Sequence, residues 1–233
     1  DPKIDNVIVE DGGHVHEIEY DSYDDWYRNK IKCKFRNQVN QGARSDLHVR
    51  VSREKKDIVS FWEMHAELRT KKFAEIPQPR QFFLNIHKAY FEEDRGFLIG
   101  AYDQDSNLVA GIVVLLEEKI AYYKFAASHP AFLALRPNNL LMDRLIAHLD
   151  EAGVRKLNLG YTGFSDQYRG LRKYKISAGA IEIPRHILKT HPYTSLNKEK
   201  VDNINCQVLE FIRRSPSMGE VDEFSQKCYS YFV

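Results

Sequence analysis

The chain has 233 residues, of which 43% are hydrophobic and 29% are charged, and its formal net charge is +1. This composition excludes a disordered or collagen-like chain. The longest apolar run covers residues 109–116 and is far shorter than the ~20 residues that a membrane-spanning helix needs. Three cysteines are too few and too scattered for a disulfide framework. We therefore expect a reduced, globular, cytoplasmic protein.

Charge is unevenly distributed over the first 56 residues. Residues 1–25 hold nine acidic side chains and one lysine, whereas residues 28–56 hold ten basic and two acidic side chains. Such a density of positive charge can attract phosphate-rich partners. A solvated helix face beside an acidic segment explains the same pattern, and from charge alone it is the better interpretation.

The first part of the chain is predicted to be mainly helical. Apolar side chains recur every four residues from Tyr23 to Val39, which predicts one amphipathic helix ending near Gly42. The next predicted elements are a strand over residues 47–51 and helices over residues 52–74 and 80–93.

Strand-forming segments follow. Three of them, separated by short polar turns, predict an antiparallel meander over residues 97–102, 108–116 and 120–127. A helix is expected to begin at Pro137 and to end before Gly153. The last expected elements are a strand over residues 156–159, a short helix over 167–174, a strand over 180–183 ended by Pro184, and a helix over 197–213. This order predicts an α/β fold, an α+β mixed sheet with helices on both faces.

Two sequence patterns suggest metal binding, and both are incomplete. Residues 103–107 begin like a calcium-binding loop, but Leu108 stands where glycine is required. His14 and His16 are spaced to share one strand face, but no further ligand is near in sequence. We therefore expect no metal site, a hairpin turn at residues 103–107 and a surface strand around His14.

The richest candidate site covers residues 160–180, which follow a predicted strand. Its glycines let a ligand approach the backbone, and its cations gather within two helical turns. On a helix, Arg172 and Lys175 share a face, as do Arg169 and Lys173. Such cations can hold a phosphate or stabilise a developing oxyanion. From these residues alone, an exposed basic helix after a glycine-rich loop is an equally good interpretation.

Several short motifs occur in a consistent order at residues 69–72, 122–128, 135–141, 153–160, 170–175 and 179–180. Together they resemble the Fem-type branch of the GNAT acyltransferase superfamily, which holds peptidoglycan-bridge aminoacyltransferases and exopolysaccharide-associated relatives. Residues 170–175 match the family's Gly-Leu-x-x-Phe-Lys pattern, with Tyr174 in the aromatic place. The resemblance implies a GNAT-like acyltransferase fold with flanking helices.

The resemblance also implies a reaction, the transfer of an acyl or aminoacyl group to an amine. The acceptor would be a cell-envelope or polysaccharide precursor, either a small molecule or a lipid- or nucleotide-linked one. The donor would be acyl-CoA or aminoacyl-tRNA, and the location the cytoplasm or the inner face of the membrane. GNAT enzymes that use CoA usually have a glycine-rich turn before the helix that corresponds to the one expected here at Pro137. In this chain, residues 128–139 form that connection and contain no glycine.

Site residues follow from the motif match. Lys175 is expected to neutralise negative charge on a phosphate or on the tetrahedral intermediate, and Tyr161 and Asp166 are further catalytic candidates. Lys175→Ala is expected to abolish transfer and to leave melting nearly unchanged, because an exposed lysine contributes little to stability. The expected substrate-binding residues are Arg172, Arg169, Ser128 and Asn138, the last two lining the donor pocket.

Three regions and two alternative functions remain open. Residues 1–51 would be an acidic segment and a basic helix, residues 52–190 the GNAT-like domain, and residues 191–233 a helical extension. Fem enzymes have two GNAT-like domains, and residues 1–50 are too short for the first, so either the chain is part of a longer protein or its acceptor differs. The alternatives are a CoA-dependent N-acetyltransferase with a degenerate pyrophosphate loop, and a non-catalytic GNAT-derived module that binds an anionic polymer through residues 28–56.

Overall fold

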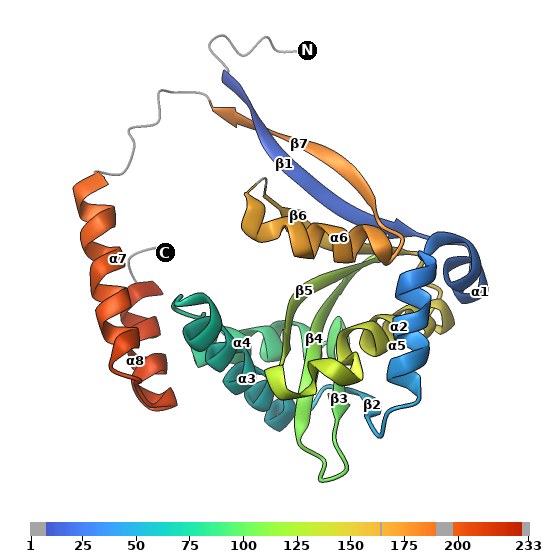
Figure 1. The fold of residues 1–233 in the computed structure, drawn as a ribbon, viewed down its shortest axis with the longest axis horizontal. Coiled ribbons are helices and arrows are strands. Elements are labelled where there is room, and N and C mark those ends of the chain that lie inside the picture. The colour runs from blue at the N-terminus through green and yellow to red at the C-terminus, as the bar shows by residue number, and fades with distance from the viewer. Residues whose placement is uncertain (1–7, 164, 190–197, 230–233) are drawn as a thin grey trace.

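A seven-stranded mixed sheet forms the centre of the molecule (Figure 1). The structure, a computed structural model, describes residues 8–163, 165–189 and 198–229. The strands, in their spatial order, are β2 (His48–Ser52), β3 (Gly96–Tyr102), β4 (Leu108–Glu117), β5 (Ile120–Ser128), β6 (Lys156–Thr162), β1 (Ile8–Glu19) and β7 (Ile181–Lys189). β5 and β6 are parallel, and the other neighbours are antiparallel. The predicted α/β fold and the meander of β3, β4 and β5 are confirmed.

Helices cover both faces of this sheet. Their bounds are α1 Tyr23–Asp25, α2 Cys33–Ala43, α3 Lys55–Phe73, α4 Arg80–Ile86, α5 Pro137–Glu151, α6 Arg169–Ser177, α7 Lys198–Arg213 and α8 Met218–Tyr229. One core lies between the sheet and α2 and α5, and the other between the sheet and α3, α4 and α8. Fully buried rings such as Phe35 and Phe61 each stabilise these cores by about 1.5–3 kcal/mol. Among the described helices, none combines the length and apolarity needed to cross a bilayer.

The single helix predicted over residues 23–39 is wrong, because the chain is broken there. A π-helical turn over Trp26–Lys30 follows α1, and Ile31 and Lys32 are extended before α2 begins. The Lys32 N–H donates to the Ser177 carbonyl at 3.0 Å, a contact with the end of α6. Tertiary hydrogen bonding therefore overrides an otherwise regular helical periodicity.

The same junction explains the small residues that follow α6. The Trp26 indole N–H donates to the Ala178 carbonyl at 2.9 Å. Gly179 has a φ of +92°, and a Cβ there would lie 2.9 Å from Lys30 Cβ. Only glycine fits this left-handed, crowded position without strain, so the Gly-Ala motif serves the packing of α6 against the broken helix.

Two strands continue past the residues expected to end them. β6 runs through Gly160 to Thr162, and β7 runs through Pro184 to Lys189. Gly160 has a φ of +72° and lies where the register between β1 and β6 shifts, so it forms a β-bulge and not a strand end. β7 is an edge strand of the described sheet, where a proline is tolerated because only one side of the strand takes part in the ladder.

The two ends of the chain also contribute elements that the periodicity did not predict. β1 is an interior strand between β6 and β7, and His16 is fully buried, so the expected surface strand around His14 is wrong at this residue. α8 packs on α3, with Val221 and Ser225 buried. At residues 103–107 the Asp103 carboxylate accepts backbone N–H bonds, which confirms the hairpin turn. The limits of the three predicted regions stay predictions.

Candidate functional site

The sheet opens between its two parallel strands, β5 and β6. Three residue pairs join them, the last being Tyr122 opposite Asn158. Beyond this pair, β5 continues to Ser128 beside β4, and β6 continues to Thr162 beside β1 (Figure 1). The carboxyl ends of the two strands therefore separate, and such an end of an α/β sheet is where ligands usually bind.

A positively charged cleft of about 720 Å³ lies at the amino end of α5, between α2 and α6. Its cations are Lys32, Lys34, Arg136 and Lys173, and no acidic side chain of the described residues lines it. Within the described residues the three lysine ammonium groups make no hydrogen bond or ion pair. Because the protein does not neutralise their charge, they are available to an anionic ligand.

The first turn of α5 supplies few backbone donors to this cleft. Pro137 has no N–H, and the N–H groups of Asn139 and Leu140 both donate to the Arg136 carbonyl. Of the backbone N–H groups in this turn, only that of Asn138 has no hydrogen-bond partner within the described residues. A phosphate in the cleft would thus be held chiefly by lysine and arginine side chains, unlike a phosphate in a glycine-rich turn.

Ser128 and Asn138, the residues expected to line the donor pocket, lie in contact. Asn138 Nδ2 donates to Ser128 Oγ at 3.3 Å, and the Asn138 carbonyl accepts from the Tyr174 hydroxyl at 2.9 Å. Asn138 lines the charged cleft, whereas Ser128 lines a small cavity of about 50 Å³ beside α3. The pair therefore lies at the junction between the two faces of the opening.

Lys175 lies under the bulged end of β6, with only 5% of its surface exposed. Its Nζ donates to the carbonyls of Gly160 and Tyr161, at 3.1 and 3.0 Å, and to Thr162 Oγ1 at 2.9 Å. These bonds use all three ammonium protons. Burial lowers the pKa of Lys175 to about 8. The expectation of an exposed lysine is wrong, because the bulge turns three acceptors toward the Lys175 ammonium group.

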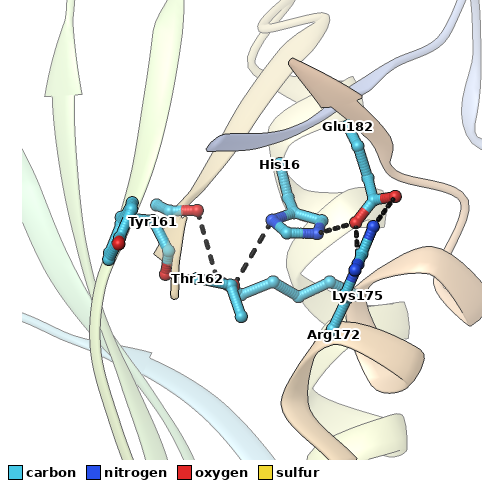
Figure 2. A network of polar contacts seen from close by, with 7 residues as sticks. His16, Tyr161, Thr162, Arg172, Lys175 and Glu182 are labelled. Carbon is cyan, nitrogen blue, oxygen red and sulfur yellow. Dashed lines mark hydrogen bonds and ion pairs between the residues drawn. The ribbon is translucent and has the colours of Figure 1, made fainter. Parts of the chain in front are cut away.

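Thr162 connects Lys175 to a buried histidine (Figure 2). Thr162 Oγ1 lies 3.4 Å from His16 Nδ1, and His16 Nε2 lies 3.0 Å from Glu182 Oε1. The Arg172 guanidinium donates twice to the Glu182 carboxylate. Because a carboxylate only accepts, the assigned tautomer of His16 carries its proton on Nε2 and accepts from the Thr162 hydroxyl at Nδ1.

This network has a cation at each end. The Arg172 hydrogen bonds, followed by that of His16, lower the pKa of Glu182 to about 2. Burial lowers the pKa of His16, and the charge of Lys175 lowers it further, so the imidazole is neutral at pH 7. The contacts join β1, β6, α6 and β7 and thereby fix the positions of Lys175 and the β6 bulge.

The low pKa of Glu182 predicts a pH-dependent stability. Because this pKa falls from its ordinary 4.5 to about 2, the stabilisation by Glu182 is complete above about pH 4.5 and lost as the pH falls toward 2. We expect Glu182→Gln to melt below the wild type at pH 7 and to approach it near pH 2 to 3. Thermal melts across this range test it, with exposed Glu118→Gln as control; a gap of constant size would contradict it.

The other predicted site residues do not join this network through their side chains. Tyr161 contributes its carbonyl, whereas its ring is 52% exposed. Asp166 and Arg169 are exposed, and neither side chain makes a hydrogen bond or ion pair within the described ranges. The structure therefore connects Lys175 with Arg172 and leaves the other two as surface groups at the start of α6.

Three members of the network were not among the sequence candidates. They are His16, Thr162 and Glu182, which come from β1, β6 and β7. His16 lies 166 positions from Glu182 and 146 from Thr162. The histidine pair at residues 14 and 16 was the available signal, but it suggested a metal. Within the described residues, no group of three or more metal-binding side chains occurs.

Comparison with protein-family models matches residues 28–175 to the family described as "Acetyltransferase (GNAT) domain". The match covers more than half of the chain. The chain belongs to the GNAT acetyltransferase family. A sequence search of curated proteins gives no match for this GNAT domain.

Solved structures with the same fold include FemX, with a TM-score of 0.65 and 14% identity over 82% of this chain and 64% of FemX. L-PGS from Bacillus licheniformis has a TM-score of 0.59 and 11% identity, over 87% of this chain and 67% of that one. The C-terminal domain of a putative lysylphosphatidylglycerol synthetase from Agrobacterium fabrum has a TM-score of 0.57 and 14% identity, over 87% of this chain and 66% of that one. The GNAT chain thus spans about two-thirds of each. At these identities the likeness shows the fold, and it confirms the predicted Fem-like GNAT architecture.

Proposed function

We propose that this GNAT domain transfers an aminoacyl or acyl group from a phosphate-bearing donor to an amine. The observation that carries the proposal is the lysine-rich cleft at the amino end of α5, beside the opening between β5 and β6. Its three lysines, which have no partner within the described residues, suit donor phosphates, and the hydrogen bond from Asn138 to Ser128 joins the cleft to the carboxyl end of β5. The family match supports the reaction class.

Direct aminolysis accounts for the chemistry with these residues. The neutral amine attacks the acyl carbonyl, whose oxygen becomes negative, and the bond to the donor oxygen or sulfur then breaks while the proton of the amine passes to that leaving group. Lys175 supplies positive potential at the end of β6 and holds the Gly160 and Tyr161 carbonyls in place. Because its protons are already used, Lys175 acts on the developing charge through its field and through the geometry of the bulge.

The donor that fits best is an aminoacyl-tRNA. The first turn of α5 has one unpartnered N–H within the described residues, which is a poor match for the pyrophosphate of CoA. The exposed rings of Tyr161 and Tyr168 both lie against Gly163. Exposed rings beside exposed cations such as Arg169 are typical of surfaces that bind single-stranded nucleic acid.

The acceptor proposed here follows the Fem-like resemblance. It is an amine on a cell-envelope or polysaccharide precursor, carried by a small molecule or linked to a lipid or nucleotide. FemX and the lysylphosphatidylglycerol synthetase domain, whose name includes a lipid, share the fold and support this class. The reaction would take place in the cytoplasm or at the inner face of the membrane.

Two alternative functions use parts of the same surface. A CoA-dependent acetyltransferase is favoured by the family match and by the place of the cleft at a helix amino end. A non-catalytic module that binds an anionic polymer through residues 28–56 is less well supported, since many of these bases are engaged within the protein. The engaged bases are Arg28 with Asp24, Lys30 with Asp25, Arg50 with Asp57, Arg53 with Asp94, and Arg36 with backbone carbonyls.

A comparison of the two donors tests the proposal. We expect labelled aminoacyl-tRNA to bind and to release its aminoacyl group to an amine-bearing envelope precursor, and acetyl-CoA to leave the melting temperature unchanged. A ligand at 100 times its Kd stabilises by about 2.7 kcal/mol, which would raise the melting temperature of a domain of this size by roughly 5–10 °C. Such a rise with acetyl-CoA, together with acetyl transfer, would establish the CoA-dependent alternative.

A further inference from the structure

A second, larger cavity lies on the opposite face of the sheet from the lysine-rich cleft. This groove, of about 1070 Å³, lies between α3, the turn that joins β3 to β4, and the segment that joins α7 to α8. His129 and Glu67 line both the groove and the small cavity beside Ser128. The groove therefore extends toward the carboxyl end of β5 on the face covered by α3, whereas the cleft lies on the face of α2 and α5.

Three polar groups that line the groove have no partner within the described residues. Tyr102 is 5% exposed, and by hydrogen-bond geometry its buried hydroxyl has no partner among the described residues; the Arg50 guanidinium lies over the ring, 4.2 Å from its centroid. Glu63 on α3 and Arg213 at the end of α7 make no hydrogen bond or ion pair there. A buried hydroxyl without a partner is uncommon in folded proteins, so its place in the wall indicates a ligand that bonds it.

The other charges of the groove are already paired. The Asp57 carboxylate accepts from Arg50 and Ser52, and Glu67 forms an ion pair with Lys71. Among the described residues, the groove therefore presents one unpaired carboxylate, that of Glu63, and one unpaired guanidinium, that of Arg213. Glu63 is one helical turn from Glu67, so the Cβ atoms of the two residues are about 5–6 Å apart along α3. Glu67 also lines the small cavity beside Ser128.

We propose that this groove binds the acceptor as an amino-acid-like ligand that carries both an ammonium and a carboxylate group. Glu63 and the Tyr102 hydroxyl bind the amine end, and Arg213 binds the anionic end. The assignment deepens the proposed transfer function and rests on it, since the groove extends toward the carboxyl end of β5 on the side opposite the donor cleft. The α7–α8 segment is then part of the substrate site, because it supplies the anion-binding residue.

Chemical-shift mapping of the full chain with the dipeptide Lys-Ala tests the groove directly. We expect saturable shifts in α3 and at residues 212–218. Glu63→Gln should weaken binding at least tenfold, and Tyr102→Phe severalfold with an unchanged melting temperature, because its hydroxyl has no bond to lose. Arg213→Gln should weaken the binding of Lys-Ala. It should leave the binding of Lys-Ala amide, which lacks the carboxylate, unchanged. The control substitutions are Glu93→Gln and Arg214→Gln, exposed charges that do not line the groove.

Three results would overturn the inference, and each can be told apart from failure of the proposed function. Shifts that map outside the groove, or unchanged binding in both Glu63→Gln and Arg213→Gln, would remove the acceptor assignment even where donor transfer is observed. If donor binding to the cleft fails while Lys-Ala binds in the groove, the transfer function is wrong and the ligand site stands. Unchanged acceptor KM in the groove variants of an active enzyme would also contradict the assignment.

Discussion

Lys175→Ala is expected to slow transfer strongly and to lower the melting temperature at the same time. The substitution leaves the buried Thr162 hydroxyl and the partly buried Gly160 and Tyr161 carbonyls without their donor. Unsatisfied buried acceptors cost about 1–3 kcal/mol, and each kcal/mol lowers the melting temperature of a domain of this size by roughly 2–4 °C. Loss of the positive field should lower the transfer rate by about 10²- to 10³-fold.

Thermal melts and single-turnover transfer measure the two effects, and Lys55→Ala is the control. Lys55 is an exposed lysine at the start of α3 that lines neither the cleft nor the groove and makes no side-chain hydrogen bond or ion pair within the described residues, so its loss should leave both melting and transfer unchanged. Lys175→Met keeps most of the volume and removes the charge. A Lys175→Ala protein that melts like the wild type would contradict the buried hydrogen bonding, and a folded, fully active one would remove Lys175 from the site.

The pH dependence of the transfer rate distinguishes a role of the Lys175 charge in transfer from a purely structural role. The pKa of Lys175 is about 8 in the folded protein and ordinarily 10.5, so the unfolded chain binds more protons between these values. The contribution of Lys175 to unfolding free energy therefore rises with pH in this interval. Transfer that depends on its charge should fall above about pH 8 in the wild type, and this decline should be absent from residual activity of Lys175→Met.

Local signals in the sequence predicted the elements that depend on local physics. The meander followed from polar turns between hydrophobic segments, and α5 lies between Pro137 and Gly153 as capping rules predict. The predicted helix over residues 23–39 failed for a non-local reason: Lys32 and Trp26 bond to the end of α6 instead of continuing the helix. Periodicity shows which side chains are buried, but it does not show that a distant carbonyl competes for a backbone N–H.

The sequence was enough to predict which cations belong to the candidate site, but not how they are arranged or buried. The motif pattern identified Lys175 and Arg172, but residue type alone favours exposure for lysine. Its burial arises because the Gly160 bulge turns three acceptors inward and β1 covers them with His16. Glu182 was not identified because nothing near it in sequence indicates that it faces a histidine from the other end of the chain.

The triple substitution Lys32→Gln, Lys34→Gln and Lys173→Gln is expected to weaken donor binding on the order of 10²-fold or more. Each lysine lines the cleft without a protein partner among the described residues, and hydrogen bonds to charged groups each contribute about 1.5–3 kcal/mol. For an aminoacyl-tRNA donor, loss of three phosphate contacts should also reduce the slope of log K against log salt by about 2. Filter binding over a salt series measures both quantities.

The control for this variant is the triple substitution Lys55→Gln, Lys56→Gln and Lys119→Gln. These lysines are exposed, lie outside the cleft and change the net charge by the same amount, so the two proteins differ only in where charge is lost. Both should melt like the wild type. Because Lys55 and Lys56 lie within residues 28–56, an equal loss of binding in the two variants would show that affinity follows the basic segment as a whole. Anionic-polymer binding along that segment would then replace a donor site at the amino end of α5.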